Sequence, residues 1–289
     1  MKKLSEKQHW DSQYVLANQD GPSVAPLSLK KKALQYLKKR LSPRTLNAMS
    51  NYANYQFSSV LLPNHLPPLL GKPVLEVGSA PGDFLLEFHK STGCIPYGVE
   101  YSEAGVEANR ANFVAHNLSP ENIIHSDFFS EDFQKPNKNR FNLVYSRGFI
   151  EHFDDAKAVV AKHIDLTAPG GHVLITIPNL RRLNYILALF FAPWLIPIHN
   201  LKIMTLGEFR KLFQDERMEP LVCQYFGTFS FNVFHDGARS HAWRQKVWAV
   251  CKYAQPLLNL IFRRWLGDRG AENGWTSPYL VYIGRKVKS

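Results

Sequence analysis

The stretch Val74–Phe84 reads V-L-E-V-G-S-A-P-G-D-F and gives the clearest structural signal in the chain. An apolar strand ends in an acidic residue and a turn of small residues, and a helical pattern begins at Phe84. Gly78 and Gly82 lack a Cβ atom, so the backbone there can bend sharply and approach a ligand closely. Glu76 stands at the end of the strand, where an open α/β sheet holds its ligand. The stretch therefore predicts a strand, a ligand-binding turn and a helix.

Strand and helix signals alternate after this stretch, which predicts parallel β-α-β units with right-handed crossovers. Strands are predicted at 73–78, 95–100, 122–126, 141–145 and 171–177, and helices at 83–91, 103–116 and 155–167. Residues 168–171 (A-P-G-G) are typical of a helix stop and turn. A capping box at Thr205 and Glu208 predicts a further helix to about residue 214. Strands at 219–228 and 278–285 are expected to form an antiparallel hairpin at the sheet edge.

The first 72 residues are expected to form a helical cap, or lid, on an α/β domain at 73–289. Residues 29–41 have the pattern of a basic amphipathic helix, and residues 45–62 that of a second helix. A cluster of helix breakers, Pro63, Pro67, Pro68 and Gly71, then ends the helical region.

Two insertions interrupt the domain, at 180–204 and at 229–275. Both leave the ends of strands, where loops build binding sites in open sheets, so we expect them to shape a pocket. Ordinary packing elements and a dimer interface are the alternatives.

The turn at Gly78 resembles motif I of the class I S-adenosylmethionine-dependent methyltransferases, usually written E/D-x-G-x-G-x-G. Ala80 replaces the middle glycine and Pro81 follows it, which leaves small residues where the backbone must stay close to a ligand. The resemblance covers residues 73–180 most closely. It implies a Rossmann-like, seven-stranded, doubly wound sheet and S-adenosyl-L-methionine as the cofactor. It also implies cofactor contacts from the motif residues Glu76, Gly78, Ser79, Ala80 and Gly82.

Glu100 closes the run G-V-E at the end of the second predicted strand, 22 residues after Gly78. A carboxylate at this place accepts hydrogen bonds from the ribose hydroxyls of a nucleoside cofactor. NAD enzymes share this acid, but the spacing E-x-G-x-x-x-G favours S-adenosylmethionine, and Tyr101 adjoins the same site. By resemblance, Asp127 holds the adenine amino group and Phe128 covers the ring. A turn-forming aspartate is the alternative.

The run F-N-L-V-Y-S-R-G-F-I-E-H-F at 141–153 is similar to the D-x-V-x-S-x-x-V-L-E-H segment of small-molecule methyltransferases, with Asn142 where an acid is commoner. The resemblance implies that Ser146 and Arg147 lie beside the methionine part of the cofactor. His152 is the candidate general base, because histidine takes up a proton near neutral pH. A helix-capping or structural histidine is the alternative.

The acceptor pocket is expected to draw on residues that flank these motifs. The segment W-D-S-Q-Y at 10–14 is similar to W-D-x-x-Y segments that fold over the cofactor, with docking on the core as the alternative. The aromatic and apolar residues of 183–198 and 243–266 suggest an acceptor with hydrophobic parts. The candidate pocket residues are Trp10, Tyr14, Glu151, Asn179 and Trp194, with Phe231, Trp243 and Trp248 as further candidates.

The formal net charge of +11 is concentrated in three segments that contain no acidic residue. Lys30–Arg44 holds seven basic residues, Arg181–Met204 three and Arg239–Arg264 six. A solvated basic surface is the simple explanation. The other explanation is an anionic partner, such as an acidic substrate or a phospholipid surface that these segments contact peripherally.

The composition, 45% hydrophobic and 13% aromatic, predicts a folded globular protein. Three cysteines without metal-ligand spacing fit free thiols in a reducing compartment, and no metal site is expected. No apolar segment follows Lys2 and Lys3, so no signal peptide is expected, and Leu183–Ile198 is too short and too interrupted to span a bilayer. The expected location is the cytoplasm, with a membrane surface as the second candidate.

The predicted function is transfer of a methyl group from S-adenosylmethionine to an oxygen or nitrogen of a small or lipid-like molecule. An RNA methyltransferase is one alternative, because of the positive charge and the S-A-P-G turn. The chain lacks the N/D-P-P-Y/F motif and an aspartate at the end of the fourth strand, so nucleic acid is not the expected partner. A non-catalytic protein that binds a membrane or a partner on this scaffold is the other alternative. The intact acidic and glycine positions argue against it.

Overall fold

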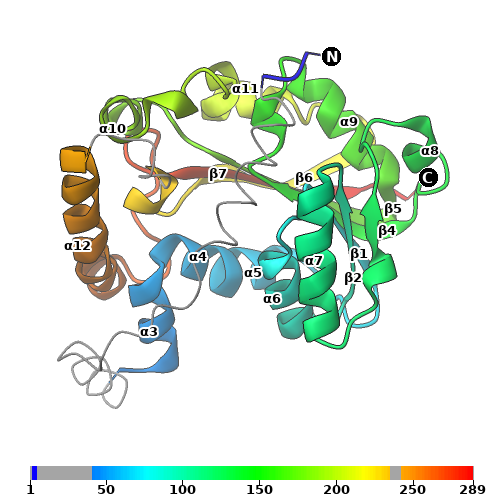
Figure 1. Ribbon diagram of the computed structural model, residues 1–289, viewed down its shortest axis with the longest axis horizontal. Helices are drawn as coiled ribbons and strands as arrows, with labels where there is room; N and C mark the ends of the chain where they lie inside the picture. The colour runs from blue at the N-terminus through cyan, green and yellow to red at the C-terminus, as the bar shows by residue number, and fades with distance from the viewer. Residues whose placement is uncertain (1, 5–40, 235–241, 289) are drawn as a thin grey trace.

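Seven strands form one sheet in the order β3-β2-β1-β4-β5-β7-β6 (Figure 1). The computed structural model describes residues 2–4, 41–234 and 242–288. Strands β1 to β5 pair in parallel, whereas β7 runs antiparallel to both β5 and β6. The strands are β1 (Pro73–Val77), β2 (Ile95–Glu100), β3 (Ile123–His125), β4 (Phe141–Arg147), β5 (Thr167–Pro178), β6 (Met218–Phe226) and β7 (Tyr279–Lys286).

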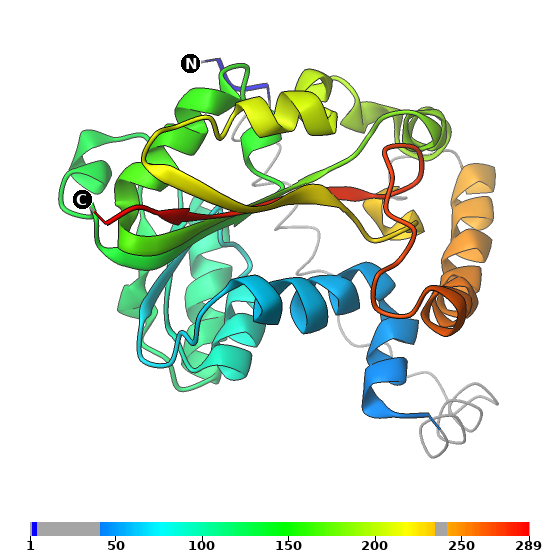
Figure 2. The same ribbon diagram turned by 180° about the vertical axis from the view of Figure 1, so that it is seen from behind.

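Helices cover both faces of the sheet. One face carries α8 (Glu131–Gln134), α9 (Ala156–Leu166), α10 (Leu183–Phe191) and α11 (Leu206–Lys211). The other carries α4 (Tyr52–Gln56), a π-helical turn (Phe57–Leu61), α5 (Leu62–His65), α6 (Asp83–Thr92) and α7 (Glu103–Ala115). Figure 2 shows the run from α4 to α5 on the side of the sheet opposite α11. Two apolar core clusters, one on each face, fill these layers. The predicted α/β, doubly wound, seven-stranded sheet is therefore confirmed.

Short 3₁₀ turns connect several of these elements. They are η2 (Pro120–Asn122), η3 (Ile150–His152), η4 (Pro193–Leu195), η5 (Leu201–Met204) and η6 (Phe231–Phe234). Helices α3 (Pro43–Ser50) and α12 (Ala242–Leu266) pack against each other at one end of the molecule, outside the sheet layers (Figure 1). Within the described ranges, no helix combines the length and apolarity that crossing a membrane requires.

Two predicted boundaries were wrong. The predicted helix at 45–62 is broken at Asn51, whose backbone is extended and whose side chain accepts a hydrogen bond from the Asn54 N–H to start α4. Asparagine caps helices because its side chain competes for backbone groups. The predicted turn at 168–171 is part of β5, since Thr167 already pairs with Phe141 across a register irregularity. The predicted helix at 29–41 lies, up to residue 40, outside the described residues.

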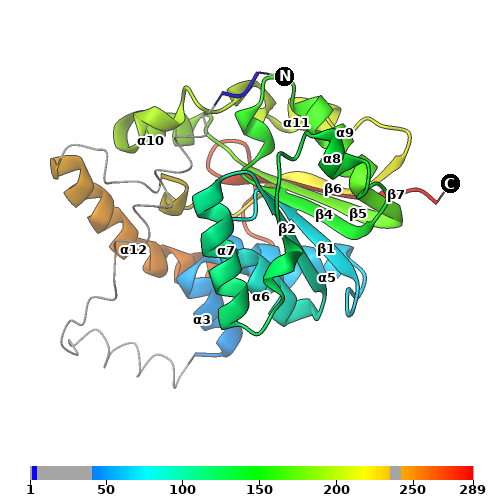
Figure 3. The same ribbon diagram turned by 45° about the vertical axis from the view of Figure 1, so that its right-hand side comes forward.

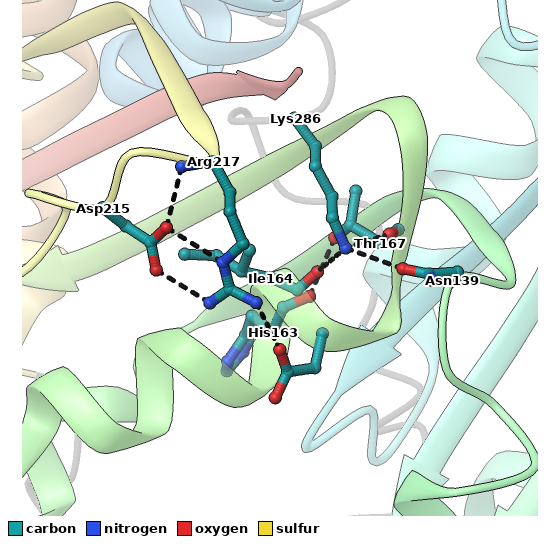
Figure 4. A network of polar contacts seen from close by, with 8 residues as sticks. Asn139, His163, Ile164, Thr167, Asp215, Arg217 and Lys286 are labelled. Atoms are coloured by element: carbon teal, nitrogen blue, oxygen red, sulfur yellow. Dashed lines mark hydrogen bonds and ion pairs between the residues drawn. The ribbon is translucent and has the colours of Figure 1, made fainter. Parts of the chain in front are cut away.

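Two cations fasten the end of α9 to strands β5, β6 and β7 (Figure 4). Lys286 Nζ donates to the carbonyl oxygens of Ile164 (2.7 Å) and Thr167 (2.9 Å) and to Asn139 Oδ1 (2.7 Å). Helix ends leave carbonyl groups without intrahelical partners, and a lysine satisfies them well. Arg217 beside it bonds both oxygens of Asp215 and one oxygen of Asp165.

The Lys286→Met variant is expected to lower the free energy of unfolding by about 1–3 kcal/mol, because buried acceptors lose their donor. Urea denaturation measures the difference. Lys288→Met, on the exposed neighbouring residue of the same strand end, is the control and should leave the stability unchanged. Equal effects of the two substitutions would contradict this assignment.

Candidate functional site

The turn between β1 and α6 lies at the carboxyl end of β1 and contains two glycines, so its backbone is not covered by side chains there. Gly78 (φ 69°) and Gly82 (φ 97°) occupy the left-handed region that favours glycine. A Cβ on Gly82 would lie 2.2 Å from Asn109 Oδ1, and a Cβ on Gly78 would lie 3.0 Å from the ring of Phe149. Asn109 also donates from Nδ2 to Ser79 Oγ at 2.8 Å. Helix α7 and the segment after β4 therefore pack directly on the turn.

A cavity of about 160 Å³ adjoins this turn at the carboxyl end of β2. Buried Glu100 lies in its wall. Its Oε1 accepts the N–H groups of Tyr101 (3.0 Å) and Ser102 (2.9 Å), and its Oε2 accepts the N–H of Ala80 (3.5 Å). The carboxylate is thus fixed by backbone from both sides. Aromatic lining comes from Phe128, Phe129, Phe149 and Phe153.

Asp127 lies at the rim of the same cavity and is about half exposed. Its Oδ1 accepts the N–H of Phe129 at 2.9 Å. Lys3 Nζ lies 3.9 Å from the Asp127 carboxylate and 4.8 Å from the centre of the Tyr101 ring. Because Lys3 also forms a β-bridge with Phe153, the start of the chain is placed beside this cavity.

A larger cavity, of about 470 Å³, lies on the other side of the turn. The two cavities share the lining residues Gly78, Ala80, Arg147, Gly148 and His152, so they adjoin. Apolar residues from five separate segments line the larger cavity, namely Phe57, Leu180, Leu195, Ile198, Phe226 and Val233. Both insertions contribute to this wall.

Glu76 is a buried carboxyl group in the wall of the larger cavity. Burial raises the pKa of Glu76 to about 8, although the positive charge of Arg147 and the hydrogen bond from Tyr145 oppose the shift. The Tyr145 hydroxyl donates to Glu76 Oε2 at 3.0 Å. The Arg147 guanidinium stacks 3.8 Å from the centre of the Phe84 ring. A buried carboxyl group and a cation therefore line this part of the cavity.

Glu151, His152 and His199 meet where the two cavities join. His152 Nδ1 donates to the Ile198 carbonyl (2.9 Å) and His199 Nδ1 to the Leu195 carbonyl (2.6 Å). Since a carbonyl only accepts, each neutral ring carries its lone pair on Nε2.

Glu151 completes this cluster with a fully buried side chain. Neither carboxylate oxygen has a hydrogen-bond partner within the described ranges, and burial raises the pKa of Glu151 to about 8. One ligand atom from each of the three residues lies within 4.8 Å of the others, so the cluster could hold a metal ion. Sequence analysis predicted no metal site and did not single out this group, because His199 comes from the first insertion and no ligand spacing links it to Glu151 and His152.

A family model described as "Methyltransferase domain" matches residues 37–217, more than half of the chain. The chain belongs to this methyltransferase family. Two curated relatives are ubiquinone biosynthesis O-methyltransferases. The protein from Thiobacillus denitrificans is 29% identical over 131 residues, which cover 45% of this chain and 55% of the relative. The protein from Albidiferax ferrireducens is 24% identical over 155 residues, which cover 54% of this chain and 59% of the relative. The match thus spans between half and three fifths of the relatives' length.

Solved methyltransferase structures share the fold. Phosphoethanolamine N-methyltransferase 2 of Haemonchus contortus superposes with a TM-score of 0.52 at 15% identity, over 81% of this chain and 53% of the other. Geranyl diphosphate C-methyltransferase of Streptomyces coelicolor gives a TM-score of 0.52 at 10% identity, over 82% of this chain and 85% of the other. The family match and the shared fold make this chain a member of the class I S-adenosylmethionine-dependent methyltransferase superfamily.

The residues of the smaller cavity fit the cofactor of this superfamily. The fixed carboxylate of Glu100 suits a ribose, and the aromatic walls suit an adenine ring. At Gly78, which has no side chain, the cavity wall is the backbone itself. The buried Glu76 carboxyl beside the turn suits the ammonium group of a methionine moiety, because a buried carboxylate needs a cationic partner.

Most of the predicted cofactor residues line one of the two cavities. These are Glu76, Gly78, Ser79, Ala80, Gly82, Glu100, Tyr101, Asp127, Phe128 and Arg147. Ser146 is the exception, because its hydroxyl donates to His163 Nε2 at 3.1 Å inside the core and lines neither cavity. Successive side chains on β4 point to opposite faces, and Tyr145, not Ser146, reaches the Glu76 side.

Only some of the candidate acceptor residues line the larger cavity. Glu151 lines the larger cavity, as does the candidate base His152. Buried Asn179 instead donates to the Ser277 carbonyl at 2.8 Å and fastens the end of β5 to the segment before β7. Trp194 lines neither cavity, and Trp243 is exposed on α12. The predictions for Trp10 and Tyr14 lie outside the described residues.

Several lining residues were missed by sequence reasoning. They are Lys3, Asn51, Asn54, Phe57, Phe149 and His199. Phe149 belongs to the quoted G-F-I-E-H run, so its place beside the glycine turn could have been expected. The others reach the site only through the packing of distant segments, and no local pattern marks them.

The Glu151→Gln variant is expected to gain stability relative to the wild type as the pH rises. Ionisation costs the folded wild type more than the unfolded chain, so the wild type loses free energy of unfolding between pH 4.5 and about 8. The amide does not titrate. The difference between the two proteins should grow by at least about 1.4 kcal/mol, the value of one pKa unit, between pH 5.5 and 8.5. Urea denaturation at the two pH values measures it, and a constant difference would contradict a raised pKa.

Proposed function

We propose that this protein transfers the methyl group of S-adenosylmethionine to an oxygen atom of a small molecule that carries an ionisable hydroxyl and an apolar part. The observation that carries the proposal is the pair of adjoining cavities. One has a nucleoside-type lining, the other combines ionisable groups with an apolar end, and His152 lines both. A methyl donor and an acceptor could therefore meet beside one histidine.

The cofactor contacts are proposed for the residues around the smaller cavity. Glu100 accepts the ribose hydroxyls, Asp127 and Phe128 contact the adenine, and the backbone from Gly78 to Gly82 lies along the methionine part. Glu76, which lines the larger cavity beside the same turn, holds the ammonium group, and the nearby Arg147 supports the charge of its carboxylate. When bound, S-adenosylmethionine supplies an electrophilic methyl group on a sulfonium centre.

His152 is proposed to remove the proton from the acceptor hydroxyl. A phenol has a pKa of about 10, so at neutral pH it needs a base to become a good nucleophile. The Nδ1–H bond to the Ile198 carbonyl fixes the ring and leaves the Nε2 lone pair as the basic site. Alignment of the acceptor oxygen with the methyl group favours the transfer.

The apolar end of the larger cavity supports an acceptor with a hydrophobic ring or tail. Leu195, Ile198 and Val233 come from the two insertions, and Phe57 comes from the N-terminal helices. Residues 41–72, the described part of the predicted cap, would then complete the pocket. Two relatives are named ubiquinone biosynthesis O-methyltransferases, which supports oxygen as the methylated atom.

Methyl transfer to a series of 1,2-dihydroxybenzenes with alkyl tails of increasing length tests the proposal. Incorporation of a labelled methyl group on oxygen is expected, with KM falling as the tail lengthens. His152→Gln should lower kcat by about 10²–10⁴-fold with little change in the KM for S-adenosylmethionine. His116→Gln, on an exposed histidine of the same fold, is the matched control and should retain full activity.

Two results would overturn the proposal. One is methylation of amine acceptors without any methylation of oxygen. The other is a His152→Gln variant that keeps the kcat of the wild type.

A further inference from the structure

Helix α12 lies at one end of the molecule (Figure 3) and presents apolar side chains to solvent. Seven large apolar side chains on it are exposed, from 39% for Val247 to 79% for Trp265. They are Trp243, Val247, Val250, Tyr253, Leu257, Ile261 and Trp265. Soluble monomers rarely expose a contiguous apolar surface of this kind unless it binds something.

The exposed residues form one stripe. They recur at intervals of three or four along a helix of 25 residues. At 100° per residue they fall within an arc of about 120°, and the helix is about 37 Å long. The stripe therefore runs along the whole length of α12 on a single side.

The opposite side of α12 holds the helix on the protein. Gln255 and Asn259 are buried, and Gln255 Oε1 accepts the Phe231 N–H at 2.8 Å. Asn259 Nδ2 donates to the Met49 carbonyl at 3.1 Å. Trp248 packs against the main core cluster. These polar and apolar contacts fix the orientation of α12. Because they all lie on one side of the helix, the exposed stripe on the other side faces solvent.

The charge on α12 is entirely positive. The helix contains five lysine and arginine residues and no acidic residue. Lys246 and Arg264 fall in the same arc as the apolar stripe, one near each end. Arg263, by contrast, pairs with Asp268 at 2.6 Å. The outward side of α12 is therefore apolar along its length and basic towards both ends.

The apolar surface continues onto α10. The rings of Phe190 and Trp243 meet edge to face at 5.5 Å, and Ile186 and Leu189 on α10 are exposed. The insertion that contains α10 has basic residues but no acidic residue between 181 and 204. Figure 1 shows α10 and α12 side by side at the same end of the molecule.

We propose that α10 and α12 form a docking surface for an anionic membrane. Helices that lie in a membrane interface combine one apolar face, tryptophan and tyrosine on that face, and lysine or arginine beside it. A second copy fits less well, because a symmetric contact would bring two acid-free basic helices together. Helix α12 also lies outside residues 37–217, the region that the methyltransferase family model matches.

The η6 turn lies between the inward side of α12 and the larger cavity. Val233 of η6 lines that cavity, and Gln255 on the inward side of α12 binds the neighbouring Phe231 backbone. If the proposed function holds, docking places the acceptor chamber next to a bilayer in which an apolar acceptor dissolves. Vesicle binding itself does not depend on methyl transfer.

Co-sedimentation with vesicles tests the docking surface on the full chain. The wild type is expected to bind phosphatidylcholine vesicles that contain 30% phosphatidylglycerol and to bind pure phosphatidylcholine at least tenfold more weakly. Leu257→Glu, which puts a charge in the middle of the stripe, should weaken binding to the anionic vesicles at least tenfold. The double variant Lys246→Glu and Arg264→Glu should remove the preference for anionic lipid.

Val114→Glu is the matched control, since Val114 is an exposed apolar residue on α7, away from α12. It should bind vesicles as the wild type does. Circular dichroism and urea midpoints identify any variant that fails to fold, and for such a variant Val250→Ser replaces the charged substitution.

Three outcomes would overturn the proposal. The first is a wild type that binds neither vesicle, or both equally. The second is Leu257→Glu binding as tightly as Val114→Glu. The third is a dimer in light scattering that Leu257→Glu dissociates, because a second copy would then cover the stripe.

Discussion

The turn between β1 and α6 has no room for side chains at Gly78 and Gly82, and the rest of the site depends on that constraint. Asn109 of α7 fills the space at Gly82, and Phe149 after β4 fills the space at Gly78. Strands β1, β2 and β4 pair in parallel, so their carboxyl ends lie together at the edge of the sheet where this turn packs. Glu76 is the residue before the last of β1, and Glu100 is the last residue of β2, so their carboxyl groups lie on either side of the same backbone turn.

Burial sets the chemistry of the larger cavity. Glu76 and Glu151 are both enclosed, and burial raises the pKa of each to about 8. The two carboxyl groups differ in their surroundings. Glu76 has a tyrosine donor and lies near Arg147, whereas Glu151 has no hydrogen-bond partner among the described residues. A site with such groups is prepared for cationic or proton-donating ligands, since these relieve the cost of a buried carboxylate.

The sequence predicted the order of strands and helices and the cavity positions of Glu100 and Asp127, because these follow from local periodicity and from motifs at strand ends. It failed for Ser146 and Asn179. Ser146 lies near the end of β4, whose phase turns it into the core. Asn179 follows β5 and fastens that strand to the segment before β7. His199 could not be predicted, since only packing of the first insertion brings it to His152. The break at Asn51 has a local cause, because asparagine is a common N-cap residue and its side chain caps α4.

Calorimetric titration with S-adenosylhomocysteine, on the wild type and on Glu100→Gln, tests the central claim most directly because it requires no knowledge of the acceptor. Glu107→Gln, on an exposed acid of α7, is the control. The account predicts a single site in the wild type and the control, and binding about 10–150-fold weaker in Glu100→Gln, the loss that corresponds to one hydrogen bond to a charged group. A wild type that does not bind, or a Glu100→Gln variant that binds equally well, would contradict it.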